Sequence, residues 1–160
     1  MIAPGWLCHN QAILTEAEFA LHGSLAELAR LADETRRFCQ ENSLDSEVEF
    51  DLNLALEELF TNSLNHGGCA GLHNAVWIRL QLADGDVRVE FCDRGSFFDP
   101  DAAPAIDLTA PLERRQAGGL GIHLVRQIVR DLQYQRRGEW NRITMRLPGK
   151  SSGRPGHPEG

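Results

Sequence analysis

The sequence lacks the long apolar runs that a membrane protein needs. None of its 160 residues belongs to an apolar stretch of about 18 residues or more, so we expect no transmembrane span. The first residues, Met1–Trp6, carry no basic cluster, and no long apolar segment follows them. We therefore expect no signal peptide and a cytoplasmic protein.

Closely spaced metal ligands are also lacking. Structural zinc sites usually contain two cysteines separated by about two to four residues, and the cysteines of this chain all lie farther apart. They are Cys8, Cys39, Cys69 and Cys92. The six histidines contain no H-x3-5-H pair beside them. We therefore expect reduced thiols and no structural zinc.

Positive charge is scarce. The chain has 16 Lys and Arg residues against 23 Asp and Glu residues, a formal net charge of −7 at pH 7. Such a protein repels phosphate groups except at a local basic patch, so we expect no direct nucleic-acid binding. The rest of the composition, with 42% hydrophobic and 24% charged residues, is typical of a globular protein. A chain of this length fits one domain that can bury roughly 70% of its unfolded surface without a disulfide or a metal.

The first half of the chain predicts one strand followed by two helices. We expect the strand over Gln11–Leu21. Ser24 and Glu27 form an S-x-x-E capping box that starts the first helix, which should end near Asn42. A second S-x-x-E pair starts the second helix, over Ser46–His66, and two glycines end it. The apolar residues of this second helix cover more than one narrow stripe, so we expect it to be packed on most sides.

The second half predicts two hairpins with a helix between them. Alternating apolar residues flank the turn signal Asp84-Gly85. The segment Ser96–Ala117 contains three prolines and no periodicity, which is typical of a functional or mobile loop. Gly118-Gly119-Leu120-Gly121 then opens a helix. A strand that begins at Tyr134 turns back as a second strand over Arg142–Leu147.

The order of these elements predicts an α+β fold. Helices come in a group and most strands are joined by hairpins, so we expect a two-layer α/β sandwich. Its helices should lie on one face of a mixed, mostly antiparallel sheet. Residues 1–148 should form this single domain, and residues 149–160, which are rich in Gly, Pro and Ser, should form a disordered tail.

One group of polar residues lies on the second helix. Glu58 and Asn62 are four residues apart, so their side chains point to the same side, and Asn65 and His66 follow. This stripe could simply face solvent. It could also form a site in which a carboxylate acts as acid or base beside an amide oxygen that binds a hard cation such as Mg2+.

Two glycine motifs follow the hairpin. Asp93-Arg94-Gly95 ends a strand, where a buried aspartate could accept a hydrogen bond from an exocyclic amine such as that of adenine. An ordinary Asp-x-Gly turn would explain the same residues. The cluster Gly118-Gly119-Leu120-Gly121 could bind an anion with the N–H groups of a helix N-terminus, or could be a hinge. It matches neither the phosphate loop G-x-x-x-x-G-K-[ST] nor the dinucleotide motif G-x-G-x-x-G.

In this order, the three motifs resemble those of the GHKL (histidine kinase-like) ATPase superfamily, which includes gyrase, Hsp90, histidine kinase and MutL types. The closest resemblance is to the anti-sigma factor serine/threonine kinase branch. Residues 56–67, LEELFTNSLNHG, look like its N box; residues 93–100, DRGSFFDP, look like its G1 box; residues 118–125, GGLGIHLV, look like its G2 box. The resemblance covers about Gln11–Leu147.

The resemblance implies a Bergerat-type ATP-binding fold with ATP and Mg2+ as ligands. Glu58 would be the general base, Asn62 would bind Mg2+, and Asp93 would bind the adenine amine beside Gly95. The remaining residues that the resemblance assigns are Gly119, Leu120 and Gly121 around the phosphates and Thr144 near adenine. Ser96–Ala117 would form the ATP lid. Phe97 replaces the second glycine of the superfamily's commonest G1 box, D-x-G-x-G, which leaves the geometry of that lid open.

The branch also implies partners. Its members phosphorylate a serine or threonine of a STAS-type anti-sigma factor antagonist and sequester a sigma factor. The resemblance therefore implies a cytoplasmic homodimeric protein kinase and anti-sigma factor that regulates transcription. A function of another class stays open, namely a nucleotide-dependent binding module that sequesters a regulator without phosphoryl transfer. Transfer of labelled γ-phosphate from ATP to a partner distinguishes the two.

Overall fold

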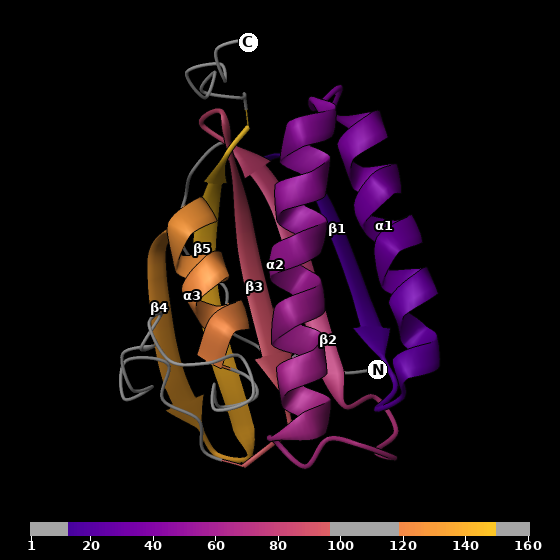
Figure 1. Ribbon diagram of the computed structural model, residues 1–160. Helices are drawn as coiled ribbons and strands as arrows, with labels where there is room; N and C mark the ends of the chain where they lie inside the picture. Colours follow the sequence, from indigo (N-terminus) through magenta and orange to yellow (C-terminus); the bar gives the residue numbers. More distant parts are fainter. Residues whose placement is uncertain (1–12, 97–118, 150–160) are drawn as a thin grey trace, which may run out of the picture.

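The computed structural model describes residues 13–96 and 119–149, which form two layers (Figure 1). One layer is a sheet of five strands within these residues: β1 (Ile13–Leu21), β2 (Val76–Ala83), β3 (Asp86–Asp93), β4 (Arg130–Arg137) and β5 (Trp140–Pro148). The other layer consists of α1 (Leu28–Glu41), α2 (Ser46–Asn65) and α3 (Gly119–Ile128). The helices lie side by side on one face of the sheet, with α2 in the middle. The predicted α+β sandwich is therefore confirmed.

The strands follow the order β1-β2-β3-β5-β4, and each neighbouring pair among them is antiparallel. The prediction of a mixed sheet is wrong for this part of the chain. The physical reason lies in the connections. The helices α1 and α2 form an up-and-down pair, so β2 returns antiparallel to β1, and α3 carries the chain to the far side of β5. Strands β3 and β4 therefore run in the same direction but do not touch.

The first helix begins with a short 3-10 turn, Leu25–Glu27, before α1. The Ser24 hydroxyl accepts a hydrogen bond from the Ala26 N–H at 3.3 Å, as expected of an N-cap. The reciprocal half of the predicted capping box is not formed. The Ser24 N–H already donates to the His22 carbonyl at 2.8 Å, and the Glu27 carboxylate pairs with Arg30 at 3.2 Å instead.

The second helix, α2, starts at the predicted residue but by a different device. Asp45 is its N-cap and makes no side-chain capping bond, so Ser46 is the first helical residue rather than the cap. Glu49 pairs with Arg36 of α1 at 3.6 Å. The helix is packed on most sides as predicted, except at Phe50, whose side chain is 66% exposed. Gly67 and Gly68 follow its C-terminal cap, which is the residue predicted as its last.

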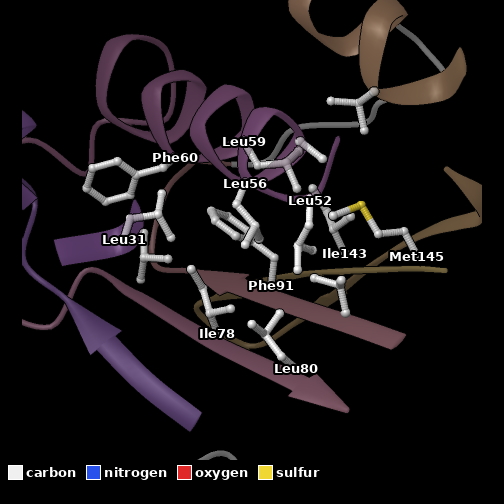
Figure 2. Packing of buried hydrophobic residues seen from close by; sticks show 14 of the residues in the cluster. Leu31, Leu52, Leu56, Leu59, Phe60, Ile78, Leu80, Phe91, Ile143 and Met145 are labelled. Atoms are coloured by element: carbon white, nitrogen blue, oxygen red, sulfur yellow. The ribbon is translucent and has the colours of Figure 1, made fainter. Parts of the chain in front are cut away.

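The hydrophobic core lies between the two layers. Figure 2 shows apolar side chains from α1 and α2 that meet alternate residues of β2, β3 and β5. The labelled members are Leu31, Leu52, Leu56, Leu59, Phe60, Ile78, Leu80, Phe91, Ile143 and Met145. Each is at most 3% exposed. Those that lie on the strands are two residues apart within a strand, because successive side chains of a strand point to opposite faces of the sheet.

The turns explain where the strand predictions hold and where they fail. Asp84 and Gly85 have φ angles of 55° and 80°, which matches the predicted two-residue hairpin. The last hairpin turns at Gly138 and Glu139, so β5 starts at Trp140, earlier than the predicted Arg142. At its other end, β4 starts at Arg130 rather than at the predicted Tyr134. The first half of β4 is mostly polar and exposed, with Leu132 partly buried against the core, and its pairing with β5 makes it a strand.

The cysteines that the structure describes are free thiols. Cys39, Cys69 and Cys92 are buried, and Cys8 lies outside the described residues. No helix in residues 13–96 and 119–149 is both long and apolar enough to cross a membrane. The expected lid after Ser96 and the expected tail from residue 150 onward also lie outside the described residues.

Candidate functional site

Two of the three motifs touch directly. Glu58 lies on α2 and is half-buried, and Gly121 is the third residue of α3. A Cβ atom added to Gly121 would overlap Oε2 of Glu58 and would lie 2.7 Å from its Cδ. The glycine therefore lets α3 approach α2 closely enough for its backbone to meet the Glu58 carboxylate.

Asn62 lies one turn along α2 from Glu58 and has an unsatisfied amide. Its Nδ2 atom is buried and has no hydrogen-bond partner among the described residues. Leaving such a group unpaired costs about 1–3 kcal/mol. Proteins tolerate that cost where a ligand completes the bond, and a carboxamide offers an oxygen for a hard cation and an N–H for a phosphate oxygen. The chemistry of Asn62 thus fits a magnesium–phosphate ligand.

Asp93 ends β3 as a buried carboxylate that is 6% exposed. Its Oδ1 accepts hydrogen bonds from the Gly95 N–H at 2.7 Å and from Asn141 Nδ2 at 2.8 Å. Its Oδ2 lies 2.9 Å from the Ser63 hydroxyl. These bonds hold a group that can only accept hydrogen bonds when ionised, which suits recognition of an amine.

Gly95 has no room for a side chain. A Cβ atom there would lie 2.7 Å from both Asp93 Oδ1 and the Gly67 carbonyl oxygen. The Ser96 N–H donates to the same Gly67 carbonyl at 2.7 Å. The turn after β3 is therefore held against the end of α2, and the G1 and N motifs meet as the G2 and N motifs do.

The polar stripe on α2 is partly exposed to solvent and partly turned toward α3. Asn65 and His66 are exposed to solvent. Glu58 and Asn62 are half-buried and lie toward α3, as the Glu58–Gly121 contact requires. The solvent-facing interpretation therefore describes the end of the stripe and fails for the two residues assigned to chemistry.

Sequence analysis missed a set of residues behind Asp93. They are Ser63, Tyr134, Arg136 and Asn141. A signal for two of them exists in the sequence. Ser63 occupies a core position of α2, and Asn141 shares the inward face of β5 with Ile143 and Met145. A polar residue on an apolar face needs a buried partner, so either could have been predicted to contact the site.

Cys69 also lies against Asp93, with its sulfur 3.9 Å from Oδ1. Burial, and after it the charge of Asp93, raise the pKa of this thiol to about 11. A thiol with such a pKa stays protonated near neutral pH, and only the thiolate is a good nucleophile. Cys69 therefore serves packing rather than chemistry.

The family follows from a comparison of the whole chain. The family model for the histidine kinase-like ATPase domain matches residues 21–147. This chain belongs to that family. The match includes all three motifs, so the resemblance inferred from them is confirmed, and ATP binding is the activity that the family name implies.

Known relatives of this histidine kinase-like ATPase domain agree. The Serine/threonine-protein kinase BtrW of Bordetella bronchiseptica is 32% identical over 98 residues, which are 61% of this chain and 69% of that protein. The structure of the RsbU and RsbW domains of Rv1364c from Mycobacterium tuberculosis matches with a TM-score of 0.62 at 16% identity. That match covers 83% of this chain but 32% of the other, and it shows a shared fold.

One predicted site residue of this histidine kinase-like ATPase domain is misplaced. Thr144 pairs with Glu90 of β3, and its neighbours Ile143 and Met145 point into the core. Strand alternation therefore puts Thr144 on the face of the sheet opposite to Asp93. The assignment of Thr144 to the adenine site is wrong. The β5 residue in register with Asp93 on the same face is Asn141.

The G2 motif lies at the start of α3. Gly119, Leu120 and Gly121 are its first three residues. The first N–H groups of a helix have no acceptor within the helix, so they can bind an anion. No three His, Cys, Asp or Glu side chains are grouped as metal ligands in the described segments.

Proposed function

We propose that this chain binds Mg2+–ATP and transfers the γ-phosphoryl group to a serine or threonine of a protein partner. The observation that carries the proposal is the contact of Glu58 with Gly121 beside the unpaired amide of Asn62. A carboxylate, a phosphate-binding helix start and a cation ligand then share one place. The name of the relative BtrW, a serine/threonine-protein kinase, supports the type of acceptor.

Glu58 is the group we assign to proton transfer. The acceptor hydroxyl oxygen attacks the γ-phosphorus as the bond between that phosphorus and the ADP oxygen breaks. The hydroxyl proton passes to the Glu58 carboxylate. Its half-buried position against the α3 backbone limits the orientations that the carboxylate can adopt, and positioning is the main contribution that a protein makes to phosphoryl transfer.

The other residues bind and orient the nucleotide. We assign Asp93 to the adenine amine, with Gly95 allowing the base to approach the backbone. We assign Asn62 to the magnesium ion, which would neutralise phosphate charge when bound. The N–H groups of Gly119, Leu120 and Gly121 are assigned to the phosphates.

By resemblance, the phosphorylated partner is a STAS-type anti-sigma factor antagonist, and a second partner is a sigma factor that the chain sequesters. The resemblance also implies that the chain acts as a homodimer in the cytoplasm. The named RsbW domain of the matched structure and the BtrW relative support this branch of the family. A binding module that uses ATP only as a ligand would keep the same nucleotide site. Phosphoryl transfer is what separates the two functions.

The nucleotide site is tested by calorimetry of ATP with and without Mg2+. We expect the wild type to bind ATP more tightly with Mg2+ and expect Asn62→Ala to lose that gain, since it removes the assigned cation ligand. Asn65→Ala is the matched control, because Asn65 lies on the same helix and is exposed. Absence of ATP binding by the wild type would overturn the proposed function.

A further inference from the structure

Asn141 is a buried carboxamide with four hydrogen-bond partners. It is 2% exposed. Its Nδ2 donates to Asp93 Oδ1 at 2.8 Å and to the Ser96 carbonyl at 2.9 Å. Its Oδ1 accepts from the Tyr134 hydroxyl at 2.7 Å and from Arg136 Nη1 at 2.8 Å. Both donors and both lone pairs of the amide are therefore used.

The partners leave the amide only one orientation. A guanidinium can only donate hydrogen bonds, so the atom that faces Arg136 must be the oxygen of Asn141. The Ser96 carbonyl can only accept, so the atom that faces it must be the nitrogen. A flipped amide would lose both contacts and would point its oxygen at the Asp93 carboxylate. Tyr134 and Arg136 thus set the direction in which Asn141 donates.

This direction makes the two oxygens of Asp93 unequal. Oδ1 receives the Gly95 N–H and the Asn141 amide, and the Cys69 thiol lies nearby. Oδ2 lies near the Ser63 hydroxyl alone among the described residues. That hydroxyl also lies 3.0 Å from the Leu59 carbonyl, and its single hydrogen can serve one acceptor at a time. Oδ2 is therefore the oxygen with capacity for another donor.

We propose that Asn141, oriented by Tyr134 and Arg136, is a positioning residue that occupies Asp93 Oδ1 and so reserves Oδ2 for the exocyclic amine of the base. This role rests on the proposed binding of ATP. Arg136 Nη1 also donates to the Gly95 carbonyl at 2.6 Å, so the same guanidinium holds the backbone that follows Asp93. Selectivity for a 6-aminopurine then depends on a residue of β5 that does not itself contact the base.

The test compares ATP with purine riboside triphosphate, which lacks the 6-amino group. We expect Asn141→Asp to weaken ATP binding about tenfold to hundredfold, because the new carboxylate repels Asp93 and cannot hold its Oδ1. Binding of the analogue should change by less than about threefold, so the ratio of the two affinities falls. A purely structural role would weaken both nucleotides equally and would overturn the proposal.

Gln135→Glu is the matched control. It makes the same amide-to-acid change at an exposed position of β4. Gln135 pairs with Arg142, the residue that follows Asn141 on β5, so the new charge lies near the site but outside it. We expect the affinity ratio of this variant to equal that of the wild type. Equal loss of the ratio in both variants would mean that added charge, and not the Asn141 amide, sets selectivity.

Tyr134→Phe provides a second route if Asn141→Asp fails to fold. It removes one of the two donors to Asn141 Oδ1, and we expect a loss of about twofold to tenfold for ATP alone. An unchanged ratio in Tyr134→Phe and in folded Asn141→Asp would overturn the positioning role while ATP binding stands. A wild type that binds neither nucleotide would overturn the proposed function and this role together.

Discussion

Two neighbouring carboxylates on α2 differ in their surroundings. Glu58 lies against the backbone of α3 at Gly121. Glu57 accepts a hydrogen bond from Asn53 Nδ2 at 2.7 Å, one turn earlier on its own helix. The two residues are adjacent in the sequence, but their side chains lie in different places. The proposed proton transfer is therefore assigned to Glu58 alone and not to an acidic surface.

Substitution of the two carboxylates separates these roles. We expect Glu58→Gln to bind ATP normally and to lose phosphoryl transfer by about 100-fold or more, because it removes the proton acceptor and keeps the shape of the side chain. Glu57→Gln should transfer at the wild-type rate. The measurement is transfer of labelled γ-phosphate to a STAS-type antagonist. Wild-type transfer by Glu58→Gln would refute the assignment of the base.

Thr144 and Asn141 permit a second comparison at the same scale. The motif resemblance assigned Thr144 to adenine, and the strand register places it on the opposite face from Asp93. We expect Thr144→Val to leave ATP affinity within about twofold of the wild type. A tenfold loss of ATP affinity in calorimetry would show that Thr144 contributes to the adenine site, as the resemblance implied, and would contradict the placement inferred from the strand register.

At the scale of elements, the approach of α3 to α2 creates the site. Alanine at Gly121 would favour the helix by about 1 kcal/mol, because glycine is a poor helix former. Its Cβ would nevertheless displace the Glu58 carboxylate. We therefore expect Gly121→Ala to keep or raise the melting temperature while phosphoryl transfer falls at least tenfold. Full transfer by this variant would contradict the contact, because the added Cβ could then be accommodated without moving the Glu58 carboxylate.

The first two helices and the first hairpin could be predicted well from the sequence. Their apolar periodicity and turn residues act locally, so α2 begins at Ser46 and the Asp84-Gly85 turn forms as expected. The first half of β4 could not be predicted, because Arg130–Gln133 has no strand pattern of its own. Pairing along β5, a long-range interaction, makes it a strand.

At the scale of the whole molecule, buried thiols link stability to pH. Cys39 is a buried residue of α1, Cys69 lies beside Asp93, and Cys92 is buried on the sheet face away from the helices. Burial is the largest cause that raises the pKa of each thiol, to about 11 for Cys39 and Cys69 and to about 12 for Cys92. The fold therefore keeps all three in the neutral form at pH values where an unfolded chain ionises them.

This link predicts alkaline destabilisation. The pKa values of the folded protein lie above the ordinary thiol value of 9.0, so the contribution of the neutral thiols is fully present below pH 9 and is lost as the pH rises toward 11 to 12. Denaturant unfolding under reducing conditions should show stability falling above pH 9. Replacement of the three cysteines by alanine should flatten that fall. An equal pH dependence in both proteins would exclude the thiols as its cause.

The sequence by itself determined the order of the elements, the helix on which Glu58 and Asn62 share a side, and the family, through three motifs in order. These features depend on periodicity and spacing within short segments. Only the tertiary structure decided which polar residues support Asp93. The register of β5 places Asn141 in the site and Thr144 outside it, and a one-residue offset in a strand reverses the face of every side chain. The all-antiparallel pairing of the described strands was likewise decided by how the helices return the chain, which no local pattern records.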